Sequence, residues 1–110
     1  MHNFRLVLGT TRVEFDSTKD EVNRRKHKYS LSCAVDIFES ALLLQYPFIT
    51  SDTFIEQGEL RHMHLAGYQG RIVLIVTTMR NEETVRVISM RDASDEERQQ
   101  YLKSLPRLLA

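Results

Sequence analysis

The sequence predicts an α+β fold in a single domain over residues 1–110, with two N-terminal helices, an antiparallel sheet of about four strands and one C-terminal helix. Three observations predict it. The chain has 110 residues, 42% of them hydrophobic, which is enough for one small core. Helical spacing of apolar residues occurs early in the chain, whereas two-residue alternation dominates its middle. A capping-box pair precedes a helical segment near the end.

Residues 1–12 are expected to form an N-terminal extension that contributes an extra strand. Apolar residues alternate with polar ones here and again after residues 9–11, which could turn the chain. The alternating residues are Phe4, Leu6, Leu8, Val13 and Phe15. We therefore predict a short hairpin or two loosely joined strands.

Two helices should follow. The first, over residues 19–28, comes after possible caps at residues 16–18 and has Val22 as its only aliphatic residue. With so little to bury, it must be held by polar contacts or used at a surface. The second begins after Ser30, and its apolar residues have the spacing of a buried helical face: Leu31, Ala34, Val35 and Phe38.

The middle of the chain predicts a meander. We expect strands at residues 42–49, 61–66, 72–79 and 85–91, a loop at residues 51–58, and turns at residues 67–70 and 80–84. Pro47 predicts an edge strand or a strand end, because proline cannot donate to a ladder. Residues 72–79 are apolar on both faces, which predicts a central strand.

The last strand delivers Arg91 to the start of a final helix. Ser94 and Glu97 have the capping-box spacing, so this junction should hold a cation beside a capped helix. Strict alternation places Arg86 and Arg91 on opposite faces unless a bulge intervenes. Pro106 should kink or end the helix. Four leucines near the end, Leu102, Leu105, Leu108 and Leu109, could pack internally or form part of a partner-binding surface.

Composition excludes several classes of function. The 15 basic and 15 acidic residues balance, so an anionic ligand must be recognised by a local cluster. The longest aliphatic run, residues 72–76, is far shorter than the roughly 20 residues of a membrane span. The N-terminus lacks the pattern of a secretory signal, and the single Cys33 fits a reducing compartment. We expect a cytoplasmic protein that does not contact membranes.

Arginines stand at the ends of three predicted strands: Arg61, Arg80 and Arg91. In a meander such ends can converge on one rim, where guanidinium groups bind phosphate and stabilise developing negative charge. Each arginine taken alone is more often a surface residue that keeps a strand edge soluble. Both interpretations stay open at this point.

Other site classes have less support. His27, His62 and His64 lack the spacing and the fourth ligand of a zinc site. Neither Ser89 nor Cys33 has the setting of a nucleophile, and no glycine-rich phosphate loop occurs. We expect no metal and no cofactor.

Two blocks of residues are similar to a known family. The first contains Phe15-Asp16, Lys19, Asn23, Lys26-His27, Ser30, Ala34 and Phe38. The second contains Arg61, Leu65, Gly70, Thr78, Arg80, residues 86–91, Ala93, Glu97 and Tyr101. In order and spacing these blocks resemble the BrnT-type toxins, over residues 13–101.

The resemblance implies a RelE-like fold and a ribonuclease toxin of a bacterial type II toxin–antitoxin pair. Such enzymes cleave RNA without metal, by helping the 2′-hydroxyl attack the adjacent phosphate. A cognate, BrnA-like antitoxin would inhibit the toxin, and operator DNA would be bound only through the antitoxin complex. Carried over to this sequence, the resemblance assigns catalysis to Arg61, Arg80, Arg91 and His27, RNA binding to Lys19, Lys26 and Arg86, and proton transfer to Glu59 or Tyr101.

The sequence departs from the family pattern at several positions. Phe15 replaces a tryptophan, Lys28 and Ala66 replace glycines, and residues 77–80 stand where Tyr-Thr-Glu-Arg is common. The missing tyrosine and glutamate beside Arg80 motivate a second hypothesis. The chain would then be a catalytically degenerate RelE-like module that pairs with an antitoxin or DNA-binding partner without cutting RNA.

Overall fold

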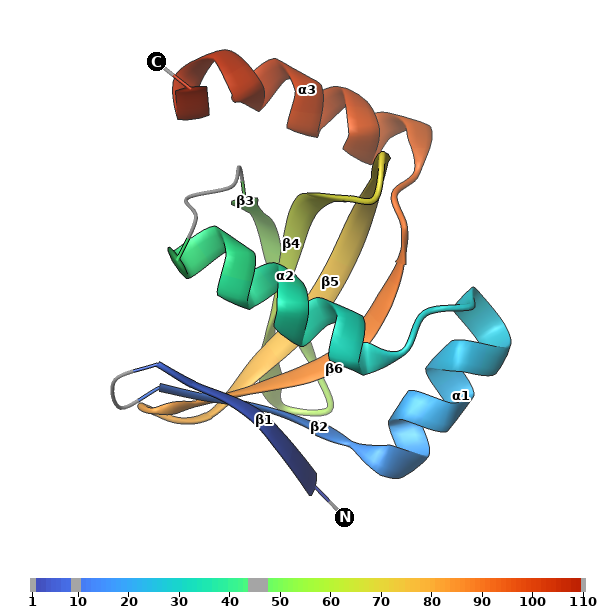
Figure 1. The fold of residues 1–110 in the computed structure, drawn as a ribbon, viewed down its shortest axis with the longest axis vertical. Helices are drawn as coiled ribbons and strands as arrows, with labels where there is room; N and C mark the ends of the chain where they lie inside the picture. Colours follow the sequence, from blue (N-terminus) through green and yellow to red (C-terminus); the bar gives the residue numbers. More distant parts are fainter. Residues whose placement is uncertain (1, 9–10, 44–47, 110) are drawn as a thin grey trace.

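A six-stranded mixed sheet lies at the centre of the structure, a computed structural model that describes residues 2–8, 11–43 and 48–109 (Figure 1). Its elements are β1 (His2–Leu8), β2 (Thr11–Asp16), α1 (Ser17–His27), α2 (Leu31–Leu43), β3 (Phe48–Glu56), β4 (Glu59–Tyr68), β5 (Arg71–Asn81), β6 (Thr84–Asp92) and α3 (Asp95–Leu109). The strand order is β1-β2-β6-β5-β4-β3. The predicted α+β class, the two N-terminal helices and the C-terminal helix are confirmed, and β5 is a central strand as expected.

The sheet differs from the prediction in strand number and direction. The N-terminal hairpin exists as predicted, but β2 also pairs with β6 in parallel, which makes the sheet mixed rather than antiparallel. The loop expected at residues 51–58 is wrong, because β3 pairs with β4 over most of that range. The polar residues of β3 do not alternate with apolar ones in the sequence. An edge strand that is exposed along much of its length does not need such alternation.

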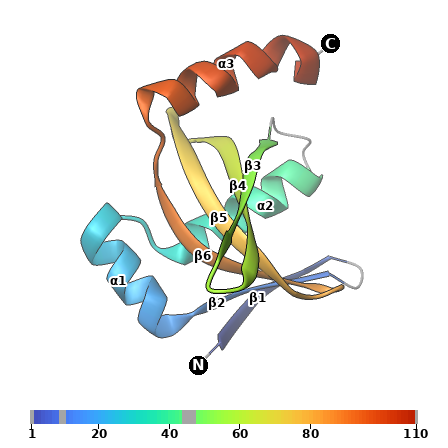
Figure 2. The same ribbon diagram turned by 180° about the vertical axis from the view of Figure 1, so that it is seen from behind.

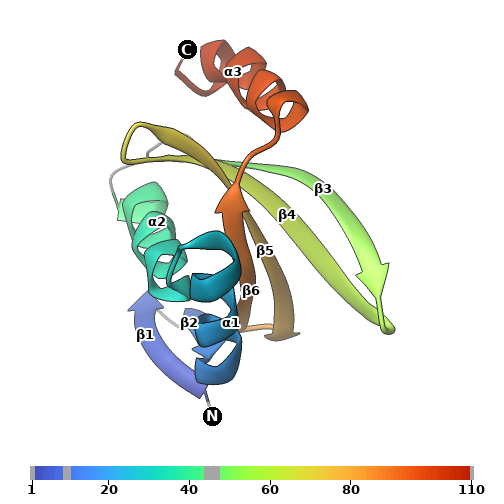
Figure 3. The ribbon, with the colours of Figure 1, turned by 90° about the vertical axis from the view of Figure 1, so that its right-hand side faces the viewer.

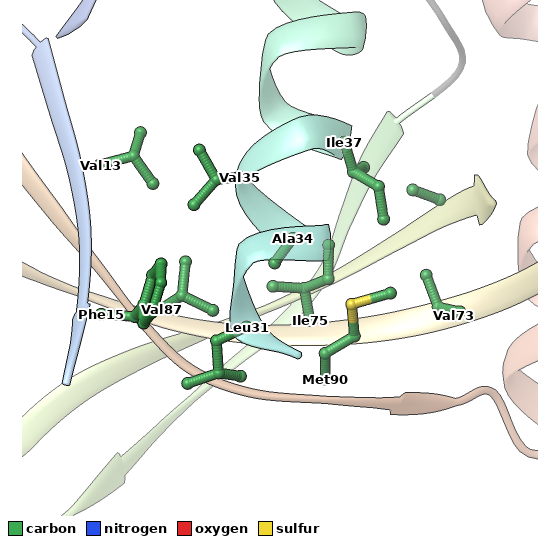
Figure 4. Packing of buried hydrophobic residues seen from close by; sticks show 11 residues of the cluster. Val13, Phe15, Leu31, Ala34, Val35, Ile37, Val73, Ile75, Val87 and Met90 are labelled. Carbon is green, nitrogen blue, oxygen red and sulfur yellow. The ribbon is translucent and has the colours of Figure 1, made fainter. Parts of the chain in front are cut away.

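Helices α1 and α2 lie on one face of the sheet, called here the α2 face, and α3 lies across one end of the other, the α3 face (Figures 2 and 3). The core of the α2 face forms between α2 and strands β2, β4, β5 and β6 (Figure 4). Its buried residues are Val13, Phe15, Leu31, Ala34, Val35, Ile37, Ala66, Val73, Ile75, Val87 and Met90. A smaller core on the α3 face contains Leu65, Leu74 and Tyr101.

Polar contacts hold α1, as its lack of an apolar stripe predicts. Asp16 caps its N-terminus by accepting from the Thr18 and Lys19 amides. Asn23 is 4% exposed, and its side-chain amide donates to the Tyr29 and Met90 carbonyls, each at 2.9 Å. Its oxygen accepts from the Met90 amide at 3.1 Å. Asn23 therefore fixes the end of α1 against β6.

A β-bulge in β6 overturns the expected alternation of that strand. Ser89 pairs with Val76 and Val87 with Thr77, so Ile88 is an extra residue. Val87 and Met90 consequently both point into the α2-face core (Figure 4). Their neighbours Arg86 and Arg91 then both belong to the α3 face, as the bulge alternative allows.

Of the two outcomes expected at Pro106, a kink or the end of the helix, the end does not occur, because α3 continues to Leu109. Leu105 packs against the α3-face core, whereas Leu102 is 47% exposed. The side chains of Leu108 and Leu109, like residues 44–47 with Pro47, lie outside the described part of the chain. No helix within the described residues is long and apolar enough to cross a membrane.

Candidate functional site

A cavity of about 680 Å³ opens where the C-terminal end of α1, the β4–β5 turn and the C-terminal end of β6 meet. We call it the helix-end cavity. It is lined by Lys26, His27, Lys28, Tyr29, Tyr68, Gln69, Arg71, Arg91 and Asp92. Segments far apart in the sequence thus bring basic and aromatic side chains together around one hollow.

Helix α1 supplies His27 and Lys26. Its last turn is basic, a composition that the negative end of the helix dipole favours, and Lys28 ends it in the left-handed conformation (φ 69°). Burial lowers the pKa of His27, and the positive charges of Lys26 and Arg91 lower it further. The imidazole is therefore neutral at neutral pH and can accept a proton beside two cations.

Strand β6 supplies Arg91, which is held as the capping-box spacing predicts. Its guanidinium donates to both carboxylate oxygens of Glu97, at 2.8 and 3.1 Å. The same carboxylate accepts from the Ser94 amide at 2.8 Å, and the Glu97 amide donates to the Ser94 hydroxyl at 3.3 Å. These contacts, with Arg91 the largest cause, lower the pKa of Glu97. The start of α3 therefore fixes the direction of Arg91.

Two aromatic rings, Tyr29 and Tyr68, also line the helix-end cavity. Tyr29 and Tyr68 meet edge to face, with ring centroids 6.2 Å apart. The Tyr29 hydroxyl donates to Asp92, which also pairs with Arg71 at 3.5 Å. A hydrogen bond with Cys33 and burial raise the pKa of Tyr68 to about 12, so this phenol stays protonated.

Three other predicted arginines lie elsewhere on the α3 face. Arg80 and Arg86 flank Glu14, whose side chain is 4% exposed, at 3.5 and 3.3 Å. Arg61 pairs with Glu56 at 2.6 Å and Glu59 at 3.4 Å. Its buried Nε has no hydrogen-bond partner among the described groups. This second set, the sheet-face arginines, comprises Arg61, Arg80 and Arg86.

The structure thus divides the predicted site residues. It gathers Lys26, His27 and Arg91 around the helix-end cavity. Lys19 lines a smaller cavity of about 290 Å³ that Lys26 and His27 also line. Glu59 lies with Arg61, outside both cavities. Tyr101 is 5% exposed in the α3-face core, where burial raises its pKa.

Sequence reasoning missed Tyr29, Tyr68 and Arg71. Arg71 stands at the first position of β5, directly after a turn. An arginine at a strand end was the signal that singled out Arg61, so the sequence could have indicated Arg71 as well. The tyrosines gave no such signal, because only the fold brings the α1–α2 connection against the β4–β5 turn. Within the described residues, no group of three or more His, Cys, Asp or Glu side chains is placed to hold a metal ion.

Comparison with known proteins identifies the family. The profile of a family described as the ribonuclease toxin BrnT of type II toxin–antitoxin systems matches residues 15–97. The chain is similar to the crystal structure of the Brucella abortus ribonuclease toxin BrnT, with a TM-score of 0.51 and 26% sequence identity. That likeness covers 74% of this chain and 94% of the Brucella chain. No curated protein matches the sequence.

The family match spans most of the chain, including α1, α2, the strands β3 to β6 and the capping box that holds Arg91. The predicted resemblance is confirmed by both comparisons. Type II systems pair a toxin with a protein antitoxin, so an antitoxin partner follows from the family. The chain belongs to the BrnT family of ribonuclease toxins of type II toxin–antitoxin systems.

Proposed function

We propose that this chain is an endoribonuclease that cleaves RNA without a metal ion in the helix-end cavity. One observation carries the proposal: a neutral histidine, His27, lines the same cavity as the cations Lys26 and Arg91. A base and positive charge are what attack of a 2′-hydroxyl on a neighbouring phosphate requires. The family supports ribonuclease activity in general terms.

In the proposed reaction, His27 accepts the proton of a ribose 2′-hydroxyl. The 2′-oxygen forms a bond to phosphorus, and the bond from phosphorus to the 5′-oxygen breaks. The leaving 5′-oxygen takes up a proton from water and His27 returns its proton to water, so the products are a 2′,3′-cyclic phosphate and a 5′-hydroxyl. Arg91 and Lys26 stabilise the negative charge that builds up on the phosphoryl oxygens.

The sheet-face arginines and Lys19 are proposed to bind the RNA backbone on either side of the cavity. The bulge at Ile88 places Arg86 on the α3 face with Arg91, and Arg61 shares that face because it pairs with Thr78, the partner of Arg86. Arg80 joins them through its contact with Glu14, which Arg86 also contacts. Their guanidinium groups suit phosphate, although each is also paired with a carboxylate. They add affinity for RNA, whereas the reacting groups belong to the helix-end cavity.

We further propose that a BrnA-like antitoxin inhibits the chain in the cytoplasm and that the complex, rather than the toxin alone, binds operator DNA. The balanced charge of the chain favours this division, because the toxin has no overall attraction to duplex DNA. An excess of antitoxin should abolish RNA cleavage.

The test is RNA cleavage by purified protein in EDTA. His27→Ala should lower the rate by about 10²–10⁴-fold, and Arg91→Ala by about 10²–10³-fold. Arg25→Ala is the matched control, because Arg25 lies in the same turn of α1 but pairs with Glu21 at the surface. Its rate should stay within about twofold of wild type. Wild-type rates in both cavity variants would contradict the proposed roles.

One observation favours the alternative of a degenerate binding module. Arg61, Arg80, Arg86 and Arg91 are each paired with a carboxylate, so an incoming phosphate must compete with Glu97, Glu14 or the Arg61 partners. On that alternative, the protein binds antitoxin but leaves RNA intact. Cleavage of many RNA molecules per protein molecule would exclude it.

A further inference from the structure

The helix-end cavity combines aromatic and cationic walls. Tyr29 and Tyr68 line it together with Arg71 and Arg91. Both tyrosines pack one part of their side chains against the α2-face core, so their rings are anchored. Each ring is half-buried, which leaves part of it facing the cavity.

Three contacts hold the aromatic wall in place. The Tyr29 ring meets the Tyr68 ring at an interplanar angle of 72°. Asp92 accepts from the Tyr29 hydroxyl and pairs with Arg71, which ties the ring to a cation. The backbone of Tyr29 is held as well, because its carbonyl accepts from the Asn23 side chain. An anchored ring loses little conformational freedom when a ligand covers it.

Aromatic rings beside cations suit unpaired bases better than paired ones. Anchored aromatic rings next to cations are the means by which proteins bind unpaired bases, since a base stacks on a ring while its phosphate meets a guanidinium. A base inside a duplex cannot reach a ring within a cavity without leaving its stack. Arg71 is 68% exposed and is thus accessible to a phosphate.

We propose that Tyr29, Tyr68 and Arg71 form a subsite for one unpaired base and its phosphate, next to His27, so that the substrate is single-stranded RNA. The proposal rests on the proposed function for the identity of the ligand as RNA. It assigns a role to three residues that none of the family-like motifs contains. The tyrosines bind the base, and Arg71 binds the flanking phosphate.

Binding of a non-cleavable oligonucleotide tests the subsite independently of catalysis. A short, labelled, fully 2′-O-methylated single strand is titrated with protein and followed by fluorescence anisotropy. Tyr68→Leu and Tyr29→Leu should each weaken binding by about tenfold, and Tyr68→Phe, which keeps the ring, should bind more tightly than Tyr68→Leu. Arg25→Ala is the matched control, because Arg25 pairs with Glu21 at the surface, and should stay within about twofold of wild type. A duplex of the same sequence should bind more weakly than the single strand.

Base recognition is separated from phosphate recognition by a series of strands, each with an abasic residue at one position. At the position that occupies the subsite, removal of the base should weaken binding to wild type as much as Tyr68→Leu weakens binding of the intact strand. The abasic strand and Tyr68→Leu combined should lose no more affinity than either change alone. Adenosine monophosphate is the comparison ligand, and should bind far more weakly than the strand. Equal affinity of wild type and both leucine variants for the intact strand, in protein whose circular dichroism is unchanged, would overturn the subsite.

The outcomes separate the subsite from the proposed function. Wild-type protein that shows this binding pattern but does not cleave RNA would retain the subsite and lose the enzyme. Protein that cleaves RNA while the leucine variants bind as wild type would retain the enzyme and lose the subsite.

Discussion

Two histidines illustrate how surroundings decide the role of a residue. His27 has a lowered pKa at the edge of a cavity, where its neutral ring faces solvent and two cations. His64 is 8% exposed inside the sheet, and both of its ring nitrogens contact threonine hydroxyls, Thr50 at 3.0 Å and Thr77 at 2.8 Å. We propose that the first exchanges protons with a substrate, whereas the second is a structural group.

His64 should make stability depend on pH. Burial, with a smaller contribution from His62, lowers its pKa from 6.5 to about 4. The unfolded chain therefore binds the proton first as the pH falls. The stability that the folded protein gains by keeping His64 uncharged is complete above pH 6.5. As the pH falls toward 4, the free energy of unfolding decreases by up to about 3 kcal/mol. Urea unfolding of wild type and His64→Gln between pH 7 and 4 measures this decrease.

In that experiment, the free energy of unfolding should fall more steeply with acidity in wild type than in His64→Gln, because carboxylates titrate in both proteins. His62→Gln is the control and should keep most of the wild-type slope, since burial is the larger cause of the His64 shift. Parallel pH profiles for wild type and His64→Gln would refute the assignment.

Sequence reasoning at the residue scale succeeded where the contacts are local. The Ser94–Glu97 spacing predicted both the cap of α3 and the cation beside it. It could not settle the face of Arg86, because one extra residue at Ile88 reverses the parity of the strand. A bulge depends on pairing with β5, which no property of β6 alone reveals.

At the scale of elements, α1 shows a helix attached by hydrogen bonds instead of apolar packing. Asn23 joins it to β6, and Asp20 joins it to α2 by accepting from the Leu31 amide at 2.6 Å and the Ser30 hydroxyl at 3.0 Å. Val22, its one aliphatic residue, is 52% exposed. The polar attachment of α1 was predictable from composition. The contact of Asn23 with Met90 in β6 was not, because Met90 lies far along the chain.

Replacing Asn23 should therefore loosen α1 and the cavity wall that it carries. Asn23→Ala leaves the buried Met90 amide without its side-chain acceptor and two carbonyls without a donor, which should cost about 3 kcal/mol. Thermal unfolding and hydrogen exchange of the α1 amides measure the loss. Asn81→Ala is the matched control, because Asn81 makes one exposed contact and should cost under about 1 kcal/mol. Equal stability of the two variants would show that α1 is held by other means.

The edge strand β3 was not predicted, because its sequence carries no burial signal. Central strands show their position by apolar residues on both faces, and residues 72–79 were predicted from that signal. An edge strand needs little burial, so Thr50, Ser51 and Asp52 are as compatible with a loop as with a strand. Its pairing with β4 is a tertiary property.

For the whole molecule, the proposed function requires a chain of zero net charge to bind an anionic polymer. The structure concentrates cations on one end of α1 and on the α3 face, and places carboxylates beside many of them. Such pairing keeps the arginines oriented and reduces non-specific attraction to nucleic acid. Family membership was predictable from ordered motifs, but the cavity that joins α1 to the β4–β5 turn required the fold.

Analysis of the RNA ends tests the central claim most directly. The protein is incubated with an excess of single-stranded RNA in EDTA, and the products are analysed by mass spectrometry. We expect many cleavages per protein molecule, each producing a 2′,3′-cyclic phosphate and a 5′-hydroxyl, with His27→Ala slowed and Arg25→Ala unaffected. Intact RNA, ends of another kind, or cleavage that EDTA abolishes would contradict it.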